Sequence, residues 1–224
     1  MTEFYGKYRG KVVNNIDPLM QARLLVEVPA VSDLPLSWAL PCVPYGGAGV
    51  GFFALPPIGA NVWVEFEGGD PNYPIWTGCF WGEGQAPAKP ALPTTKMLKT
   101  ETTTFEINDL LTTLSLAVTT PAGPVKIEQG PDGISLSIGS TSLKLTIQGL
   151  DAASPPSTLS IGPDGISLEN ASAAATIAAA GLSLKNGAAT FDMTPASIEI
   201  KNGAGSIAVS PATVNLNNGA LEVM

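Results

Sequence analysis

The feature that most constrains this chain is an internal repeat in its second half. The heptapeptide Gly-Pro-Asp-Gly-Ile-Ser-Leu at residues 130–136 recurs unchanged at residues 162–168, and residues 185–200 align without gaps on residues 201–216. Each 16-residue unit holds two short stretches of alternating apolar and polar residues, separated by Asn-Gly or Pro-Ala turns. One strand and its turn therefore take about eight residues, a period that predicts a stacked β-solenoid. Single apolar positions keep the 16-residue spacing, as in Phe191, Ile207 and Val223.

The repeat also indicates how many chains the solenoid needs. A coil of two strands is thin for a single-chain β-helix, which encloses its core from three faces. We therefore expect three intertwined chains, each contributing one strand to every layer around a narrow apolar axis. Because a single chain would leave apolar edges open to aggregation, folding and trimerisation should be coupled. About 16 strands stacked roughly 4.8 Å apart would form a rod about 75 Å long.

The first half of the chain has a different composition. Thirteen of the fifteen aromatic residues, including all four tryptophans, lie at or before Trp81, so a bulky aromatic core is possible only there. Short β-prone stretches bounded by turn residues predict five strands, at residues 7–13, 23–28, 38–43, 61–67 and 73–81. Five short strands of this kind predict a small barrel.

A segment rich in Gly, Pro and Ala separates the two halves. Residues 82–93 have the sequence Gly-Glu-Gly-Gln-Ala-Pro-Ala-Lys-Pro-Ala-Leu-Pro, which can neither extend a helix nor fill a sheet. We therefore expect an all-β protein with a barrel domain at 1–82, a semi-rigid linker at 83–95 and a repeat domain at 96–224.

Composition excludes several classes of function. The chain has no histidine, which removes Ser-His-Asp and Cys-His catalysis and imidazole metal sites. Two cysteines are too few for a zinc site or a disulfide scaffold, and a net charge of −8 disfavours nucleic acid and anionic membranes. The first residues lack a signal-peptide pattern, and no run of 18 apolar residues occurs. We expect no catalytic residue, no metal and no cofactor.

Several motifs of the first half closely resemble one known family. The most specific are Phe-Phe-Ala-Leu-Pro-Pro at 52–57 and Glu-Phe-Glu-Gly-Gly-Asp-Pro at 65–71. Further similar segments lie at 6–13, 17–18, 26–29, 38–42 and 74–78. Over about residues 5–82 the sequence resembles the phage baseplate assembly protein V family, the OB-fold domain of contractile-tail spikes and of VgrG proteins of type VI secretion. In that family an OB-fold trimer caps a triple-stranded β-helix, so the resemblance implies an OB-fold barrel followed by an intertwined trimeric needle.

The resemblance also implies a structural function. A homotrimer of this chain would be the central, cell-puncturing spike of a contractile injection system such as a phage tail, a tailocin or an extracellular phage-like particle. It would be assembled in the cytoplasm, join a baseplate hub protein at its OB-fold end, and contact the target membrane only during puncture. VgrG-like relatives suggest an alternative, a carrier or adaptor that delivers effectors docked on its tip.

Three departures from such relatives shape the expected partners. No lysozyme domain lies between barrel and repeat, the OB motif starts within ten residues of Met1, and no histidine is present to hold the iron found at the tip of many short phage spikes. The hub is therefore expected to be a separate subunit. A separate PAAR-type tip protein is expected to sharpen the needle, docked at Leu221, Val223 and Met224.

Other interpretations of the acidic residues are less favoured. Glu65 and Glu67 could form a catalytic pair, but a solvated strand face before a turn explains them better. Asp132 and Asp164, each within Gly-Pro-Asp-Gly, could be calcium ligands, but they are ordinary β-turn residues without acidic companions. A β-helical polysaccharide depolymerase would need clustered carboxylates, which the sequence does not offer.

The barrel raises two further alternatives. Cys42 and Cys79 are expected to pack as small hydrophobic residues inside it, and a disulfide between them is left open. OB folds often bind single-stranded nucleic acid through a basic groove with stacking aromatics. Residues 1–90 hold 5 Lys+Arg against 8 Asp+Glu, so we expect no nucleic acid and assign the aromatic residues to the barrel core and a trimer interface.

Overall fold

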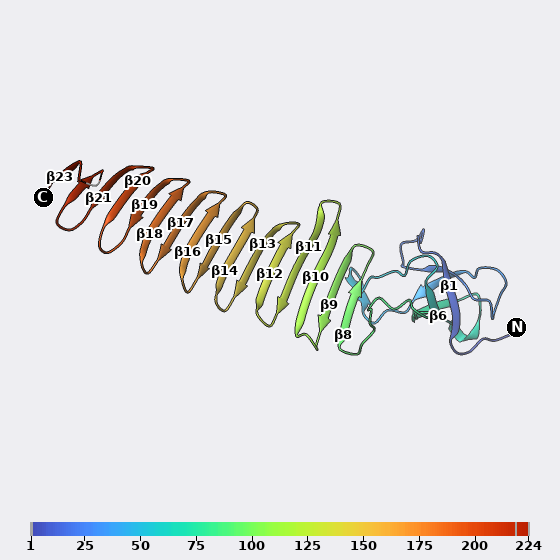
Figure 1. Cartoon of the computed structure of the whole chain (residues 1–224). Helices are drawn as coiled ribbons and strands as arrows, with labels where there is room; N and C mark the ends of the chain where they lie inside the picture. Colours follow the sequence, from blue (N-terminus) through green and yellow to red (C-terminus); the bar gives the residue numbers. More distant parts are fainter. Residues whose placement is uncertain (1, 218, 224) are drawn as a thin grey trace. The chain divides into compact units, whose positions relative to one another are not determined.

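The computed structural model describes residues 2–217 and 219–223, which form two compact units, residues 1–86 and 87–224 (Figure 1). The described residues form strands and one 3-10 turn, Glu67–Gly69, which confirms the all-β class. Nowhere in these residues is there a helix with the length and hydropathy needed to cross a bilayer.

The first unit is a closed five-stranded barrel, as predicted. Its strands close in the order β1-β2-β3-β7-β6, and β3 and β7 run parallel whereas the other neighbours are antiparallel. The barrel strands are β1 (Tyr8–Asn14), β2 (Leu24–Glu27), β3 (Trp38–Pro41), β6 (Asn61–Phe66) and β7 (Pro74–Cys79). A small hairpin of β4 (Gly46–Gly47) and β5 (Val50–Gly51) lies in the connection between β3 and β6.

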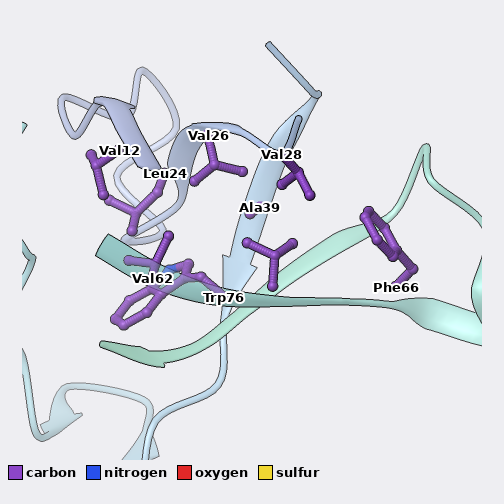
Figure 2. Packing of buried hydrophobic residues seen from close by; sticks show 9 residues of the cluster. Val12, Leu24, Val26, Val28, Ala39, Val62, Phe66 and Trp76 are labelled. Atoms are coloured by element: carbon purple, nitrogen blue, oxygen red, sulfur yellow. The ribbon is translucent and has the colours of Figure 1, made fainter. Parts of the chain in front are cut away.

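A largely aliphatic core fills the barrel (Figure 2). Strand β6 shows how it forms, because Val62, Val64 and Phe66 alternate with less buried residues and all point inward. The full core consists of Val12, Leu24, Val26, Val28, Ala39, Val62, Val64, Phe66 and Trp76. Only Phe66 and Trp76 among the aromatic residues of this half belong to it, so the expected aromatic core is mostly valine.

Cys42 and Cys79 are exposed thiols that do not form a disulfide, so the expectation that they pack inside the barrel is wrong. Each lies three residues after a buried residue, Ala39 for Cys42 and Trp76 for Cys79. Because side chains alternate along an extended strand, this odd offset points the Cys42 thiol away from the core. The offset does not explain Cys79, because a register shift in β7 interrupts the alternation between Trp76 and Gly78; Cys79 pairs with the inward-facing Val62 and is exposed at the end of its strand.

An ion pair holds the loop between β1 and β2. The Asp17 carboxylate is 3% exposed, and it accepts hydrogen bonds from the Arg23 guanidinium (Nη2 to Oδ1, 2.6 Å) and from the backbone N–H groups of Leu19 and Gln21. The Arg23 guanidinium holds the pKa of this carboxyl well below its usual range. Arg23 also lies over the Trp38 ring, 5.6 Å from its centroid, so the pair ties the loop to the barrel wall.

The second unit is one antiparallel sheet of sixteen strands in which each strand pairs with the next (Figure 1). The strands are β8 (Thr95–Lys99), β9 (Thr103–Asn108), β10 (Thr113–Thr120), β11 (Gly123–Gly130), β12 (Gly133–Ile138), β13 (Thr141–Thr146), β14 (Gly149–Ser154), β15 (Ser157–Gly162), β16 (Gly165–Asn170), β17 (Ala173–Ala178), β18 (Gly181–Asn186), β19 (Ala189–Met193), β20 (Ile198–Asn202), β21 (Gly205–Val209), β22 (Val214–Leu216) and β23 (Leu221–Val223). From β12 to β19 each strand starts eight residues after the one before it, which confirms the step inferred from the repeat.

The hydrogen-bond ladder of this sheet runs within one chain. Consecutive strands pair with each other from β8 to β23. One chain therefore forms a continuous sheet by itself, with one strand at each step along its length. At a strand spacing of about 4.8 Å the sheet extends over about 70 Å.

Glycines at the start of alternate strands allow a close approach of the next strand. Gly149 has φ +152°, and a Cβ atom there would lie 1.9 Å from the carbonyl oxygen of Ile161. Only glycine accepts this conformation and this contact. The same contact recurs every 16 residues, at Gly133, Gly165 and Gly181, so this part of the repeat is a steric requirement of the ladder.

Candidate functional site

The candidate functional site is one face of the sixteen-stranded sheet. Because the strands keep their register, one residue from each strand aligns in a row that crosses the whole sheet, which we call the central row. It consists of Leu98, Phe105, Leu116, Ile127, Leu136, Leu143, Ala152, Leu159, Leu168, Ala175, Leu184, Phe191, Ile200, Ile207, Leu216 and Leu221. Every position in this row is apolar.

Two further rows flank the central row on the same face, because residues two apart on a strand share a face. The second row is apolar from β12 to β22 and consists of Ile134, Leu145, Leu150, Ile161, Ile166, Ile177, Leu182, Met193, Ile198, Val209 and Val214. The third row lies on the other side and consists of Val118, Val125, Ile138, Thr141, Ser154, Ser157, Asn170, Ala173, Asn186, Ala189, Asn202 and Gly205.

The opposite face of the sheet is polar. It carries every charged residue of strands β12 to β21, namely Lys144, Asp151, Glu169, Lys185, Asp192, Glu199 and Lys201. Side chains on neighbouring strands are linked there, since Ser160 Oγ donates to Asp151 (2.7 Å) and Ser183 Oγ donates to Asp192 (2.6 Å). One side of the sheet is therefore suited to water and the other is not.

The apolar face has no cover within a single chain. Leu168 is 55% exposed and Ile177 is 52% exposed, and the whole buried core of the described residues belongs to the barrel. A hollow of about 360 Å³ opens on this face near Ala152. Ala152 is the small central-row residue that lies between Leu143 and Leu159 on the neighbouring strands. A sheet with one apolar face and no core of its own needs another apolar surface to cover it.

The C-terminal end of the sheet contains the residues expected to dock a tip protein. Leu221 is 56% exposed and pairs with Leu216 in the central row, and the backbone of Val223 pairs with that of Val214. Met224 lies outside the described residues. Strand β23 ends the sheet, and strand length falls from eight residues in β10 and β11 to three in β22 and β23.

The acidic residues considered as catalytic or metal-binding groups are not brought together. Glu65 lies on β6 and pairs with Lys7 (2.7 Å), whereas Glu67 begins the 3-10 turn, so the two carboxylates do not share a strand face. Asp132 and Asp164 lie in turns between strands. Within residues 2–217 and 219–223 no group of three or more His, Cys, Asp or Glu residues could hold a metal ion.

The barrel has an exposed apolar surface that sequence reasoning did not identify as a site. Tyr45, Phe52 and Phe53 lie in the connection between β3 and β6, and Phe53 is 76% exposed. Together with Met20 of the β1–β2 loop they line a hollow of about 570 Å³. The Phe-Phe-Ala-Leu-Pro-Pro run pointed to a family, but only the structure places its aromatic rings outside the core.

Comparison with protein families finds a match in each of the two units. The family model for the type VI secretion system/phage-baseplate injector OB domain matches residues 8–81, which span the barrel strands. The family model for the phage baseplate V C-terminal trimerisation domain matches residues 149–222, which extend from β14 into β23. A comparison with curated proteins finds no match. The matched trimerisation domain thus includes ten strands of the sheet that carries the uncovered apolar face.

Proposed function

We propose that this chain, which belongs to the phage baseplate V family of spike proteins, forms as a homotrimer the central cell-puncturing needle of a contractile injection system. The observation that carries the proposal is the apolar face of the sheet. This face is uncovered in a single chain. The residues that form it from β14 onward are those matched by the family model of a trimerisation domain. The family supports the coarser part of the proposal directly, a structural component of a baseplate spike.

In the proposed trimer, three copies cover one another's apolar faces. Three sheets with their central rows toward a common axis enclose the leucines and isoleucines, and the polar faces point outward to water. Covering a half-exposed Leu or Ile contributes on the order of 1 kcal/mol, and the central and second rows supply many such residues. This geometry supports one chain per face and agrees with the expectation that folding and trimerisation are coupled.

The ladder of the sheet suits a part that carries load along its length. The strands lie across the sheet, so their backbone hydrogen bonds point along its long direction and each layer supports the next. We propose that sheath contraction drives this needle through the target envelope, with contact to the membrane only during puncture. This role uses stiffness and shape, and it requires no catalytic group or cofactor.

The two ends of the chain are proposed to have different partners. A baseplate hub protein, as a separate subunit, would bind the barrel, which has an exposed apolar surface around Phe52 and Phe53. A PAAR-type tip protein would dock at Leu221, Val223 and Met224. The short last strand and the exposed Leu221 side chain support this end as a docking point.

A carrier or adaptor that delivers effectors docked on its tip is the second candidate function. The observation that favours it is the position of β23 at the end of the sheet, where the described residues offer no further strand on one side. Such an edge can accept a strand from another protein. A variant lacking residues 221–224 separates the two functions, because a carrier would lose co-purifying effectors whereas a needle without cargo would show none in either form.

Cryo-electron microscopy of the contractile particle that contains this chain tests the proposed function. We expect three-fold density matching three sixteen-stranded sheets at the centre of the baseplate, ahead of the tube. The chain would be assembled into a phage virion or a phage-like contractile particle. Density for the chain at the periphery of the baseplate, or one copy per particle, contradicts the proposal.

A further inference from the structure

The two apolar rows do not by themselves fix the height at which three copies meet. The central and second rows are apolar at every strand from β12 to β22, and the heptapeptide at 130–136 recurs at 162–168. Sliding one copy along its neighbours by four strands, about 20 Å, again places apolar residues against apolar residues. A repetitive face of this kind specifies register only weakly. Some other feature must select the correct alignment.

The third row is the row of the apolar face that changes its chemistry along the sheet. It is apolar in β10 to β12, at Val118, Val125 and Ile138. It becomes hydroxylic at β13 to β15, and from β16 asparagine alternates with a small residue. Asn170, Asn186 and Asn202 then follow at intervals of 16 residues, and we call these three residues the asparagine column.

The asparagine side chains have room to reach beyond their own chain. Asn186 lies between Ala173 and Ala189 on the neighbouring strands, and Asn202 lies between Ala189 and Gly205. All three asparagines are exposed. Asn170 donates from Nδ2 to Ser157 Oγ (2.9 Å), which leaves its amide oxygen and its second N–H available.

We propose that the asparagine column sets the register of the trimer, through hydrogen bonds between copies of this chain, against slides that bring asparagines level with the apolar part of the third row. The inference rests on the proposed homotrimer. When three copies are in register, the same asparagine from each copy lies in the same layer, and amide donors and acceptors meet at equal height. A slide by four strands, the interval of the repeated heptapeptide, brings Asn170 to the layer of Ile138 and leaves its amide without polar partners. Single polar residues in apolar interfaces select register in coiled coils by the same principle.

A simpler role for these residues is turn formation. Each asparagine is the last residue of its strand, directly before a turn, where asparagine is favoured. The two roles differ in what they predict. Loss of a turn former weakens the sheet evenly, whereas loss of a register signal leaves a trimer whose copies meet at several heights and whose end strands lie partly uncovered.

The test compares the full-length chain with a variant carrying Asn170→Val, Asn186→Val and Asn202→Val. Sedimentation equilibrium first establishes mass, and hydrogen–deuterium exchange with mass spectrometry then follows peptides from β8–β9 and β20–β21. For the variant we expect the trimer mass of the natural chain but two isotopic envelopes in peptides at both ends, one protected and one exchanged. The natural chain should give one protected envelope. The matched control carries Thr158→Val, Thr176→Val and Thr190→Val, which lie on the polar face of the same part of the sheet, and should also give one envelope.

Each remaining outcome has a definite meaning. A single envelope in the asparagine variant, whether equal to that of the natural chain or uniformly less protected, overturns the register role and favours the turn role. A variant that no longer trimerises also overturns it, because a more apolar third row should not prevent assembly. A natural chain that is itself monomeric defeats the proposed homotrimer, which distinguishes that failure from failure of the register role.

Discussion

The barrel and the sheet are both built from short strands, but only the barrel buries a core. In the barrel, five strands close on themselves and enclose residues such as Leu24 and Val62, which are fully buried. In the sheet, sixteen strands continue in one direction, and leucines such as Leu168 lie half-exposed on one face. Closure makes a unit whose apolar residues are covered by its own chain. A repeat that never closes makes an apolar face that only other copies can cover.

The largest expected effect comes from placing charge on the apolar face. Leu168→Asp together with Leu184→Asp should abolish the trimer, because burying unpaired carboxylates in an apolar layer costs several kcal/mol each. Sedimentation equilibrium and gel electrophoresis without heating measure the loss of the trimer. The matched control is Ser167→Asp, next to Leu168 but on the polar face, and it should assemble normally. Assembly of the double variant would mean that the apolar face is not the interface.

A substitution in the barrel core should destabilise the barrel and leave assembly of the trimer intact. Leu24→Ala removes a fully buried side chain and should lower the free energy of unfolding of the barrel by about 2–5 kcal/mol. Tryptophan fluorescence reports this selectively, since all four tryptophans lie at or before Trp81. Leu34→Ala, at a side chain that is exposed, is the control and should have little effect. Loss of the trimer in Leu24→Ala would show that the two regions depend on each other.

A smaller effect is expected from the glycines that the ladder requires. Gly165→Ala places a Cβ about 2.1 Å from the carbonyl oxygen of Ile177 and should destabilise each copy by about 1–3 kcal/mol. The melting temperature of the trimer should fall accordingly in circular dichroism. Gly162→Ala, where a Cβ meets only ordinary contact at 3.5 Å, is the matched control. Equal melting of both variants would remove the steric explanation of the 16-residue spacing.

The smallest expected effect is a pH dependence confined to the barrel. Because Arg23 depresses the pKa of Asp17 in the folded state, the ion pair contributes its full stability above the ordinary carboxyl pKa of about 3.9 and loses it as pH falls further. Urea unfolding followed by tryptophan fluorescence at pH 7 and pH 3 should show the first part of this loss, which continues as the pH falls toward the lowered pKa of Asp17. Asp17→Asn should lower stability at pH 7 and reduce the difference between the two pH values. An unchanged difference would assign the acid sensitivity to other carboxyl groups.

The parts of the fold that follow from local pattern could be predicted from the sequence. Apolar–polar alternation and turn residues are local features, so the sequence was enough to predict the five barrel strands and the eight-residue step of the sheet. The family motifs around Phe52 also pointed to the correct family. The exposure of the cysteines could not be predicted in this way. Whether Cys42 faces inward depends on which alternate residues of its strand point into the closed barrel. The pairing with neighbouring strands, rather than the residues of the strand itself, decides which set of alternate residues points inward.

Row membership at the end of the sheet also required the structure. Val223 lies 16 residues after Ile207, yet Ile207 belongs to the central row, whereas the backbone of Val223 pairs with that of Val214 in the second row. The reason is that Leu216 pairs with Leu221, two residues earlier than a continued repeat would place its partner. The asparagine column was hidden for a related reason. Asn170, Asn186 and Asn202 are visible in the sequence as turn residues, but only the strand register assigns them to the apolar face.

The most direct test of the central claim is the mass of the full chain in solution by sedimentation equilibrium. The claim is that the apolar face of the sheet is covered by other copies of the same chain. We expect a mass of three times 23.0 kDa, independent of concentration over a wide range and retained on heating and in detergent. A species of 23.0 kDa with the circular dichroism of a folded sheet would contradict the claim, because the apolar face would then be stable without a cover.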